Sequence, residues 1–168
     1  MTAQIPEKLL YEGRELRLCH EPLQAFLKYT DAVVKGLSDP ADDSLYSTTA
    51  CWRGYVGTWK IESDRLYLVA IGPGLCIEID GKMTDLIAAY PQGLFAHWFT
   101  GEMRCPRGKQ LEYVHGGYAS VFEEDLLLQI KCGQLVDKKL RHNGTAAPDA
   151  PDGYQVAAFT VMSKNDEA

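Results

Sequence analysis

Short apolar runs separated by turn residues dominate the chain between residues 48 and 142. The runs are rich in aromatic and β-branched residues, and glycine, proline and acidic residues lie between them, which is typical of β-strands joined by tight turns. The clearest hairpin pairs residues 48–61 with 65–71. Other strands are predicted at 8–11, 15–19, 75–79, 94–103, 109–115, 118–122, 126–130, 134–142 and 155–162. The predicted turns include Glu12-Gly13-Arg14, Asp80-Gly81, Pro106-Arg107-Gly108 and Cys132-Gly133.

A helical period replaces the strand pattern after Pro22. Leu23, Phe26 and Leu27 begin this period, and it predicts a helix that continues through residues 33–34 and ends at Gly36. A second segment, 84–90, predicts one or two helical turns. The expected fold class is therefore mainly β (α+β): an antiparallel meander, sandwich or barrel-like sheet with one N-terminal helix packed on it.

Some predicted strands are bulky on both faces. Residues 48–61 and 94–99 do not alternate apolar and polar side chains, so we expect both of their faces to be covered. The length of 168 residues predicts a single domain over 1–168. Residues 143–153 are rich in proline, alanine, aspartate and glycine and predict a flexible linker before a C-terminal strand.

Net charge and cysteine spacing exclude several kinds of partner and site. The 17 basic and 23 acidic side chains give a net charge of −6, which argues against nucleic acid as a partner. The N-terminal residues show no basic-then-apolar signal and no apolar stretch long enough for a membrane span, so a cytoplasmic protein without a membrane partner is expected. Five cysteines without a close pair indicate reduced thiols. We expect neither a metal nor a cofactor.

A candidate recognition face lies in the segment Trp52-Arg53-Gly54-Tyr55-Val56-Gly57-Thr58-Trp59. On a strand, Arg53, Tyr55 and Trp59 share one face. An arginine between aromatic rings can stack on them and still bind a carboxylate. The alternative is a core strand in which the rings pack and Arg53 pairs with a glutamate or aspartate of the chain.

Histidines mark a second group of candidate binding residues. His97 and Trp98 lie in one predicted strand, and His115 and Tyr118 flank a glycine pair. The spacing of the histidines is not that of a metal site. A glycine pair beside a histidine can serve a hydrolase-like enzyme centred on His115, with Ser120, Glu123 or Asp125 as its partner.

Acidic residues form a run at Glu123, Glu124 and Asp125. Such a run can steer a basic partner, such as a toxin with a basic cleft, because complementary charge speeds association. The alternative is a solvated loop. The basic residues at 138–142 are interpreted as an edge strand protected from aggregation by lysine.

Short motifs in this chain resemble those of two groups of proteins. The run Gly57-Thr58-Trp59-Lys60-Ile61 resembles the G-x-W element of lipocalins and fatty-acid-binding proteins, and this resemblance implies a β-barrel that holds an apolar ligand. Four short segments of the chain resemble small uncharacterised bacterial proteins, some of them immunity-like. These segments are W-R-G-Y-V-G-T-W-x-I, R-L-Y-L, F-A-H-W-F-T-G and Y-V-H-G-G-Y. This resemblance implies a bacterial origin and an accessory or immunity-type role.

These observations favour a non-enzymatic intracellular protein-binding module, of a toxin-neutralising (immunity-like) or accessory type. One alternative is a small-molecule binder with a calycin-like barrel, in which Arg53 meets a carboxylate and Tyr55 and Trp59 line an apolar pocket. The other is the hydrolase-like enzyme centred on His115. The expected binding residues are Arg53, Tyr55, Trp59, His97, Trp98, His115, Tyr118, Glu123, Glu124 and Asp125.

Overall fold

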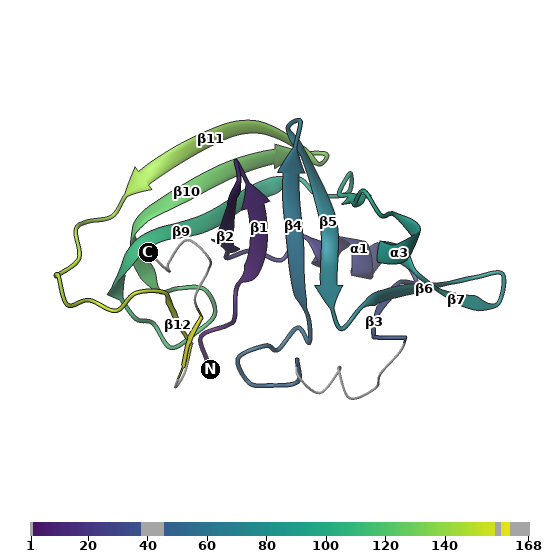
Figure 1. The fold of residues 1–168 in the computed structure, drawn as a ribbon, viewed down its shortest axis with the longest axis horizontal. Coiled ribbons are helices and arrows are strands. Elements are labelled where there is room, and N and C mark those ends of the chain that lie inside the picture. Colours follow the sequence, from purple (N-terminus) through teal and green to yellow (C-terminus); the bar gives the residue numbers. More distant parts are fainter. Residues whose placement is uncertain (1, 38–45, 157–158, 162–168) are drawn as a thin grey trace.

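The computed structural model describes residues 2–37, 46–156 and 159–161, and it is mainly β (Figure 1). Two helices are present in the described residues, α1 (Leu23–Tyr29) and α3 (Leu86–Ala89). The strands are β1 (Glu7–Tyr11), β2 (Arg14–Leu18), β3 (Val33–Val34), β4 (Val56–Glu62), β5 (Arg65–Gly72), β6 (Leu75–Ile79), β7 (Lys82–Asp85), β8 (Leu94–Phe95), β9 (Gly101–Glu112), β10 (Val121–Lys131), β11 (Gln134–His142), β12 (Tyr154–Val156) and β13 (Phe159–Val161). The mainly β prediction is confirmed.

The largest sheet has eight strands in the order β2-β1-β4-β5-β11-β10-β9, with β8 paired to β5. Figure 1 shows β9, β10 and β11 arching over from the upright β4–β5 pair. The sheet is open, because β2 and β9 lie at its two ends. Its ends nevertheless lie close together, because the backbone N–H of Cys19, just after β2, donates to the carbonyl of Arg104 at 2.8 Å, and Arg17 of β2 donates to the carbonyl of Pro106 in β9 at 3.3 Å.

The sheet is mixed, so the prediction of a purely antiparallel sheet is wrong in one place. β1 pairs antiparallel with β2 but parallel with β4, with Leu9 opposite Trp59. The β1–β2 hairpin is separated from β4 in sequence by α1 and β3. This long connection allows β1 and β4 to run in the same direction, which a short turn does not.

Side chains on the concave face of the large sheet form the main core. Leu9, Trp59, Leu68, Met103 and Leu128 are all fully buried in it. Along β4, buried and half-buried residues alternate. Within this chain, full cover is therefore seen on one face of β4 only, and the other face is half-buried.

The N-terminal helix is present but shorter than predicted. Helix α1 ends at Tyr29, and Thr30 donates its hydroxyl to the carbonyl of Phe26 at 2.7 Å. The apolar residues that continue the helical pattern, Val33 and Val34, instead form β3 and pair with β6. β-branched residues fit a strand better than a helix. The helix packs Leu23, Phe26 and Leu27 against the core.

Two predicted strands end or begin elsewhere. The segment 48–55 is a loop, and β4 starts only at Val56. Residues 94–103 are divided, because β8 ends at Phe95 and the backbone turns with Phe99 N–H donating to Ala96. Both segments are rich in residues that favour strands, but their backbone groups form hydrogen bonds within turns instead of hydrogen bonds between strands.

The predicted turn at Pro106-Arg107-Gly108 is wrong, because β9 runs through it from Gly101 to Glu112. β9 is the last strand of the sheet order, where a proline without an N–H is tolerated. Gly108 has φ +78° beside an irregular register with β10. It is therefore a bulge rather than a reversal.

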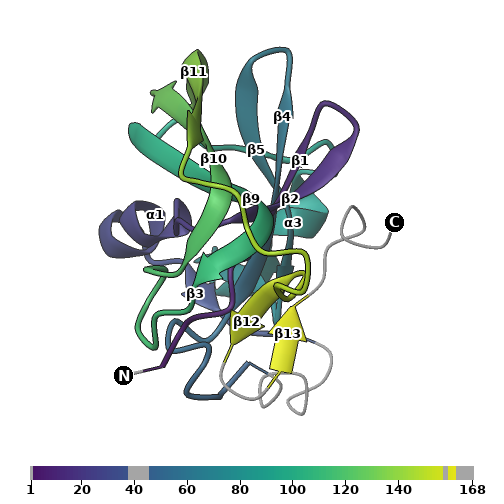
Figure 2. The same cartoon turned by 90° about the vertical axis from the view of Figure 1, so that its left-hand side faces the viewer.

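The C-terminal part forms a small separate hairpin of β12 and β13, where a single strand was predicted. Figure 2 shows it at the end of the molecule opposite the tip of the β4–β5 hairpin. Residues 143–153 contain neither helix nor strand. The start of this segment is held, because Asn143 N–H donates to Glu123 O and Ala146 N–H donates to Glu123 Oε1.

Candidate functional site

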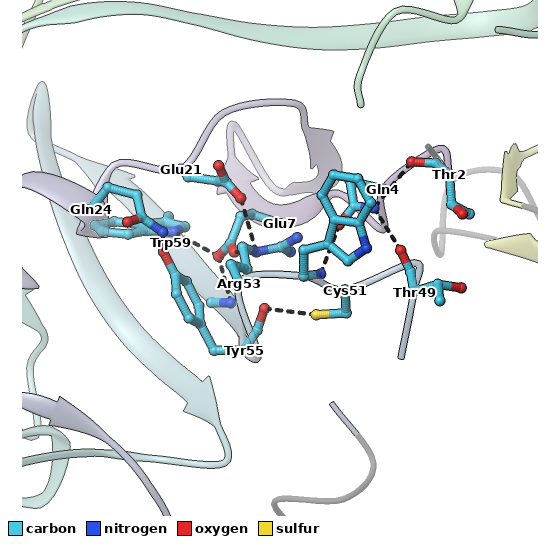
Figure 3. Close-up of polar contacts among 12 residues, drawn as sticks. Thr2, Gln4, Glu7, Glu21, Gln24, Thr49, Cys51, Arg53, Tyr55 and Trp59 are labelled. Atoms are coloured by element: carbon cyan, nitrogen blue, oxygen red, sulfur yellow. Dashed lines mark hydrogen bonds and ion pairs between the residues drawn. The ribbon is translucent and has the colours of Figure 1, made fainter. Parts of the chain in front are cut away.

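A buried carboxylate, Glu7, is the centre of the most extensive polar network near the N-terminus. Strand alternation in β1 places Glu7 on the same inward face as Leu9. Its side chain is fully buried and accepts hydrogen bonds from Arg53 Nε at 2.6 Å, Trp59 Nε1 at 3.2 Å and the backbone N–H of Gly57. Figure 3 shows this carboxylate between Arg53 and Trp59.

The close approach of Glu7 explains the glycine at position 57. A Cβ atom at Gly57 would collide with Glu7 Oε2 and press on Trp59 Nε1. Glycine inside a strand commonly marks such an approach. The sequence Gly57-Thr58-Trp59 thus supplies two of the three donors and the space for the acceptor.

Burial and charge act in opposite directions on this pair. Burial raises the pKa of Glu7 to about 7, against the lowering effect of the Arg53 charge and the hydrogen bonds from Arg53, Trp59 and Gly57. Burial also opposes the charged form of Arg53, but the negative charge of Glu7 keeps the arginine pKa above its ordinary value. Glu21 is a second acidic neighbour, with Oε1 3.6 Å from Arg53 Nε.

The loop that carries Arg53 is also tied down by Gln4. The side chain of Gln4 donates to the carbonyls of Thr2 and Thr49 and accepts from the backbone N–H of Trp52 at 2.8 Å. Residues 46–54 are named here the Trp52 loop. Within it, Cys51 N–H donates to Thr48 and Gly54 N–H donates to Cys51, so the backbone on both sides of Trp52 is fixed.

The side chain of Trp52 is exposed, although its backbone N–H belongs to this network. Its relative exposure is 60%, whereas the Arg53 side chain next to it is 2% exposed. The Trp52 loop lines a shallow pocket of about 360 Å³, to which Tyr46 and Trp52 both contribute. Tyr46 also lines a second pocket of about 480 Å³ with Ile5 and Lys8. The exposed indole of Trp52 is therefore carried by a backbone held in place by hydrogen bonds, and it lies next to a shallow pocket.

The structure brings together the three residues of the expected recognition face but places them inside. Tyr55 and Trp59 are 1% and 0% exposed, and the Arg53 guanidinium lies 5.5 Å from the ring centroid of Tyr55. This arrangement matches the alternative in which the rings pack and Arg53 pairs with a glutamate. Tyr118 belongs to the same neighbourhood, because its phenol interacts electrostatically with Arg53.

His97, Trp98 and His115 lie apart from Glu7 and have other partners. Trp98 packs on Phe26, with ring centroids 4.6 Å apart, and donates to the carbonyl of Pro22. The exposed ring of His97 lies 5.6 Å from that of Trp98. His115 is exposed, and its Nδ1 lies 2.8 Å from the hydroxyl of Tyr113.

The proposed partners of a catalytic His115 are bound elsewhere. The hydroxyl of Ser120 accepts from the backbone N–H of Val114. Glu123 accepts from the backbone N–H groups of Lys109 and Ala146, and these two bonds lower its pKa.

The acidic residues Glu123, Glu124 and Asp125 interact with other groups of the same chain. Asp125 is buried and accepts from Arg104, Arg141 and Asn143 at 2.8, 2.6 and 3.0 Å. Although burial opposes ionisation, these hydrogen bonds and the charge of Arg104 hold the pKa of Asp125 below its ordinary value. Glu124 lies 3.2 Å from Nδ1 of His142. The run therefore fixes the start of the 143–153 segment.

Sequence reasoning missed Gln4, Glu7 and Trp52. The signal for Glu7 was available, because a strand period of two places it with Leu9 on an apolar face. The composition around Trp52 predicts a strand, whereas Trp52 lies on a loop before β4. Gln4 gave no local signal, since its three bonds reach Thr2, Thr49 and Trp52 only in the folded chain.

Comparison with protein-family models, curated proteins and solved structures gives no match to this chain. Among residues 2–37, 46–156 and 159–161, no helix has the length and apolar character needed to cross a membrane. No cluster of three or more histidine, cysteine, aspartate or glutamate side chains in those ranges is arranged to hold a metal ion.

Proposed function

We propose that this chain is a non-enzymatic binding module that recognises another protein through the Trp52 loop. The observation that carries the proposal is the 60% exposure of Trp52 on a backbone that buried groups hold in place. Tryptophan is one of the residue types enriched among the energetic anchors of protein interfaces. An anchor that is already ordered loses little conformational entropy on binding.

The surroundings of Trp52 support a protein partner. Shallow pockets of about 360 and 480 Å³ share Tyr46 as a common wall. Together with the exposed indole they give the mixture of aromatic ridge and hollow that interface cores use. The buried Glu7–Arg53 pair acts as the support beneath this surface rather than as part of it.

The net charge of −6 favours a partner with a basic surface. A toxin with a basic cleft is one such partner, so the toxin-neutralising or accessory role belongs to this proposal. The support comes from the overall charge rather than from Glu123, Glu124 and Asp125, because those side chains have partners in the chain.

Site-specific photo-crosslinking in the source cells tests the proposal. A benzophenone amino acid is placed at Thr48, an exposed residue of the Trp52 loop, so that Trp52 itself is kept, and, as a matched control, at Tyr90, which is 50% exposed. The expected result is one protein adduct that forms from position 48 and not from position 90. The absence of an adduct at 48, or the same adducts from both positions, would overturn the proposal.

A further inference from the structure

Arg53 has two carboxylates close to it, and only one of them is fully buried. Its Nε lies 2.6 Å from Oε1 of Glu7 and 3.6 Å from Oε1 of Glu21. The Glu7 side chain is 0% exposed, whereas that of Glu21, which precedes helix α1, is 32% exposed. Both carboxylates point toward Arg53 in Figure 3. One buried positive charge is therefore shared unequally between two negative ones.

The guanidinium has hydrogen-bond donors left for a second carboxylate. Nη1 and Nη2 of Arg53 are buried and have no acceptor among the described residues, and only Nε is bound by Glu7. Buried charged donors without acceptors are costly, so Glu7 does not hold the arginine to its full capacity. A small displacement of the guanidinium would shorten the 3.6 Å contact with Glu21 to the length of a charge-assisted hydrogen bond, about 2.8 Å.

We propose that the Arg53 side chain exchanges between Glu7 and Glu21, and that this exchange regulates the Trp52 loop. When Glu7 is the partner, its carboxylate binds both the Arg53 side chain and the backbone N–H of Gly57, so the chain between them is tied at both ends. When Glu21 is the partner, the residue directly after Trp52 is tied to the segment before α1 instead. The regulatory part of the proposal rests on the function proposed above for Trp52.

Protonation of Glu7 drives the exchange. Burial raises the pKa of Glu7 to about 7, so a proton removes its negative charge near neutral pH. A neutral carboxyl group still accepts the hydrogen bonds from Gly57 and Trp59, but it no longer attracts the guanidinium charge. Arginine stays charged at these pH values, and Arg53 then moves to the other carboxylate beside it, Glu21.

The remaining titratable groups of this neighbourhood stay neutral over the same pH range. Burial raises the pKa of each of them above its ordinary value, which already lies above about 8 for thiols and phenols. These groups are Cys19 after β2, Cys51 and Tyr55 around Arg53, and Tyr118. A change near neutral pH in this neighbourhood is therefore assigned to Glu7.

Fluorine NMR of the intact chain labelled with fluorotryptophan tests the exchange without a partner. The chain has three tryptophans, whose signals are assigned with Trp52→Phe and Trp98→Phe. Trp59 donates to Glu7 and reports its protonation, whereas Trp52 reports the state of the loop. Between about pH 5.5 and 8.5 we expect the Trp52 and Trp59 signals to shift with one common midpoint near 7.

Two glutamate variants separate the exchange from a simple effect of the Glu7 charge on Trp52. In Glu21→Gln the second carboxylate is gone, so the Trp59 signal should still titrate while the shift of Trp52 shrinks at least severalfold. Glu7→Gln should hold the Trp52 signal at its low-pH position at every pH; if it does not fold, the native profile and Glu21→Gln decide. Glu62→Gln removes an exposed carboxylate at the end of β4 and should behave as the native chain does.

A Trp52 signal that does not titrate, or an undiminished Trp52 shift in Glu21→Gln, would overturn the exchange. Both outcomes are measured without a partner, so they are separate from a failure of the crosslinking experiment.

The crosslinked partner then tests the regulation. Its affinity for the native chain, relative to Glu7→Gln, should fall about tenfold between about pH 8 and pH 6, because affinity follows the population of the state that fixes the loop. A ratio that is constant over this range, with the NMR shifts present, would overturn the regulatory role.

Discussion

Trp52 and Trp59 lie seven positions apart and have opposite environments. Trp59 is 0% exposed and donates to Glu7, whereas Trp52 is 60% exposed. Trp59→Ala should lower the free energy of unfolding by about 3–5 kcal/mol, because it leaves a cavity in the core. Trp52→Ala should change it by no more than about 0.5 kcal/mol. Urea unfolding monitored by circular dichroism measures both, and equal losses would contradict the assignment.

Because the pKa of Glu7 is raised in the folded chain, Glu7 makes the free energy of unfolding decrease as the pH rises. Its pKa rises from an ordinary 4.5 to about 7 on folding, so the folded chain holds the proton more tightly. The contribution of Glu7 to stability is therefore fully present below the unfolded pKa and is lost as the pH rises through about 7.

Urea unfolding at several pH values between about 5 and 8 checks this sign. The difference between the native chain and Glu7→Gln should fall as the pH rises. Glu112→Gln, at an exposed position on β9, serves as the control and should not change the profile. A difference that grows with pH would mean that the ion pair with Arg53 outweighs the effect of burial.

At the scale of residues, the sequence predicted which side chains interact better than it predicted which side chains are exposed. The pairing of Arg53 with an acidic residue and the shared face of Tyr55 and Trp59 followed from the pattern. That Glu7 is the partner depends on β1 lying beside β4, which no local signal specifies. The outward direction of Trp52 depends on a loop that resembles a strand in composition.

At the scale of elements, β9, β10 and β11 are joined by Asp125. Asp125→Asn should lower stability by about 1.5–3 kcal/mol, because it weakens the hydrogen bonds of a buried carboxylate with Arg104 and Arg141, whose own side chains are 21% and 51% exposed. Amide exchange should rise at Asn143, whose side chain donates to Asp125. Glu124→Gln, one residue earlier and paired with the exposed His142, should cost no more than about 1 kcal/mol. Equal effects of the two changes would contradict the account of the acidic run.

Local elements were predicted where the turn chemistry was unambiguous. β6 and β11 have the predicted bounds, and Asp80 and Cys132 adopt positive φ in their turns. The end of α1 was missed because Val33 and Val34 continue its period but pair with β6. The long β9 was missed because a proline at a sheet edge does not break a strand.

At the scale of the whole molecule, strand order depends on contacts between distant segments. The parallel pairing of β1 with β4 and the hydrogen bonds between the ends of the open sheet have no signature in neighbouring residues. The mainly β class was predictable from composition and spacing, whereas the mixed, open topology was not.

The net charge of −6 also makes a prediction at this scale. If the crosslinked partner has a basic surface, the association rate constant should fall at least severalfold between about 50 and 500 mM salt, since screening removes the steering. The dissociation rate should change much less. Stopped-flow mixing measures both rates, and an association rate insensitive to salt would argue against charge-guided recognition.

The most direct test of the central claim is the affinity of the crosslinked partner for three chains: native, Trp52→Ala and Tyr90→Ala. Trp52→Ala should weaken binding about 30-fold or more, corresponding to about 2 kcal/mol for an interface anchor, with an unchanged melting temperature. Tyr90→Ala should bind as the native chain does. A Trp52→Ala chain that folds normally and keeps native affinity would contradict the account.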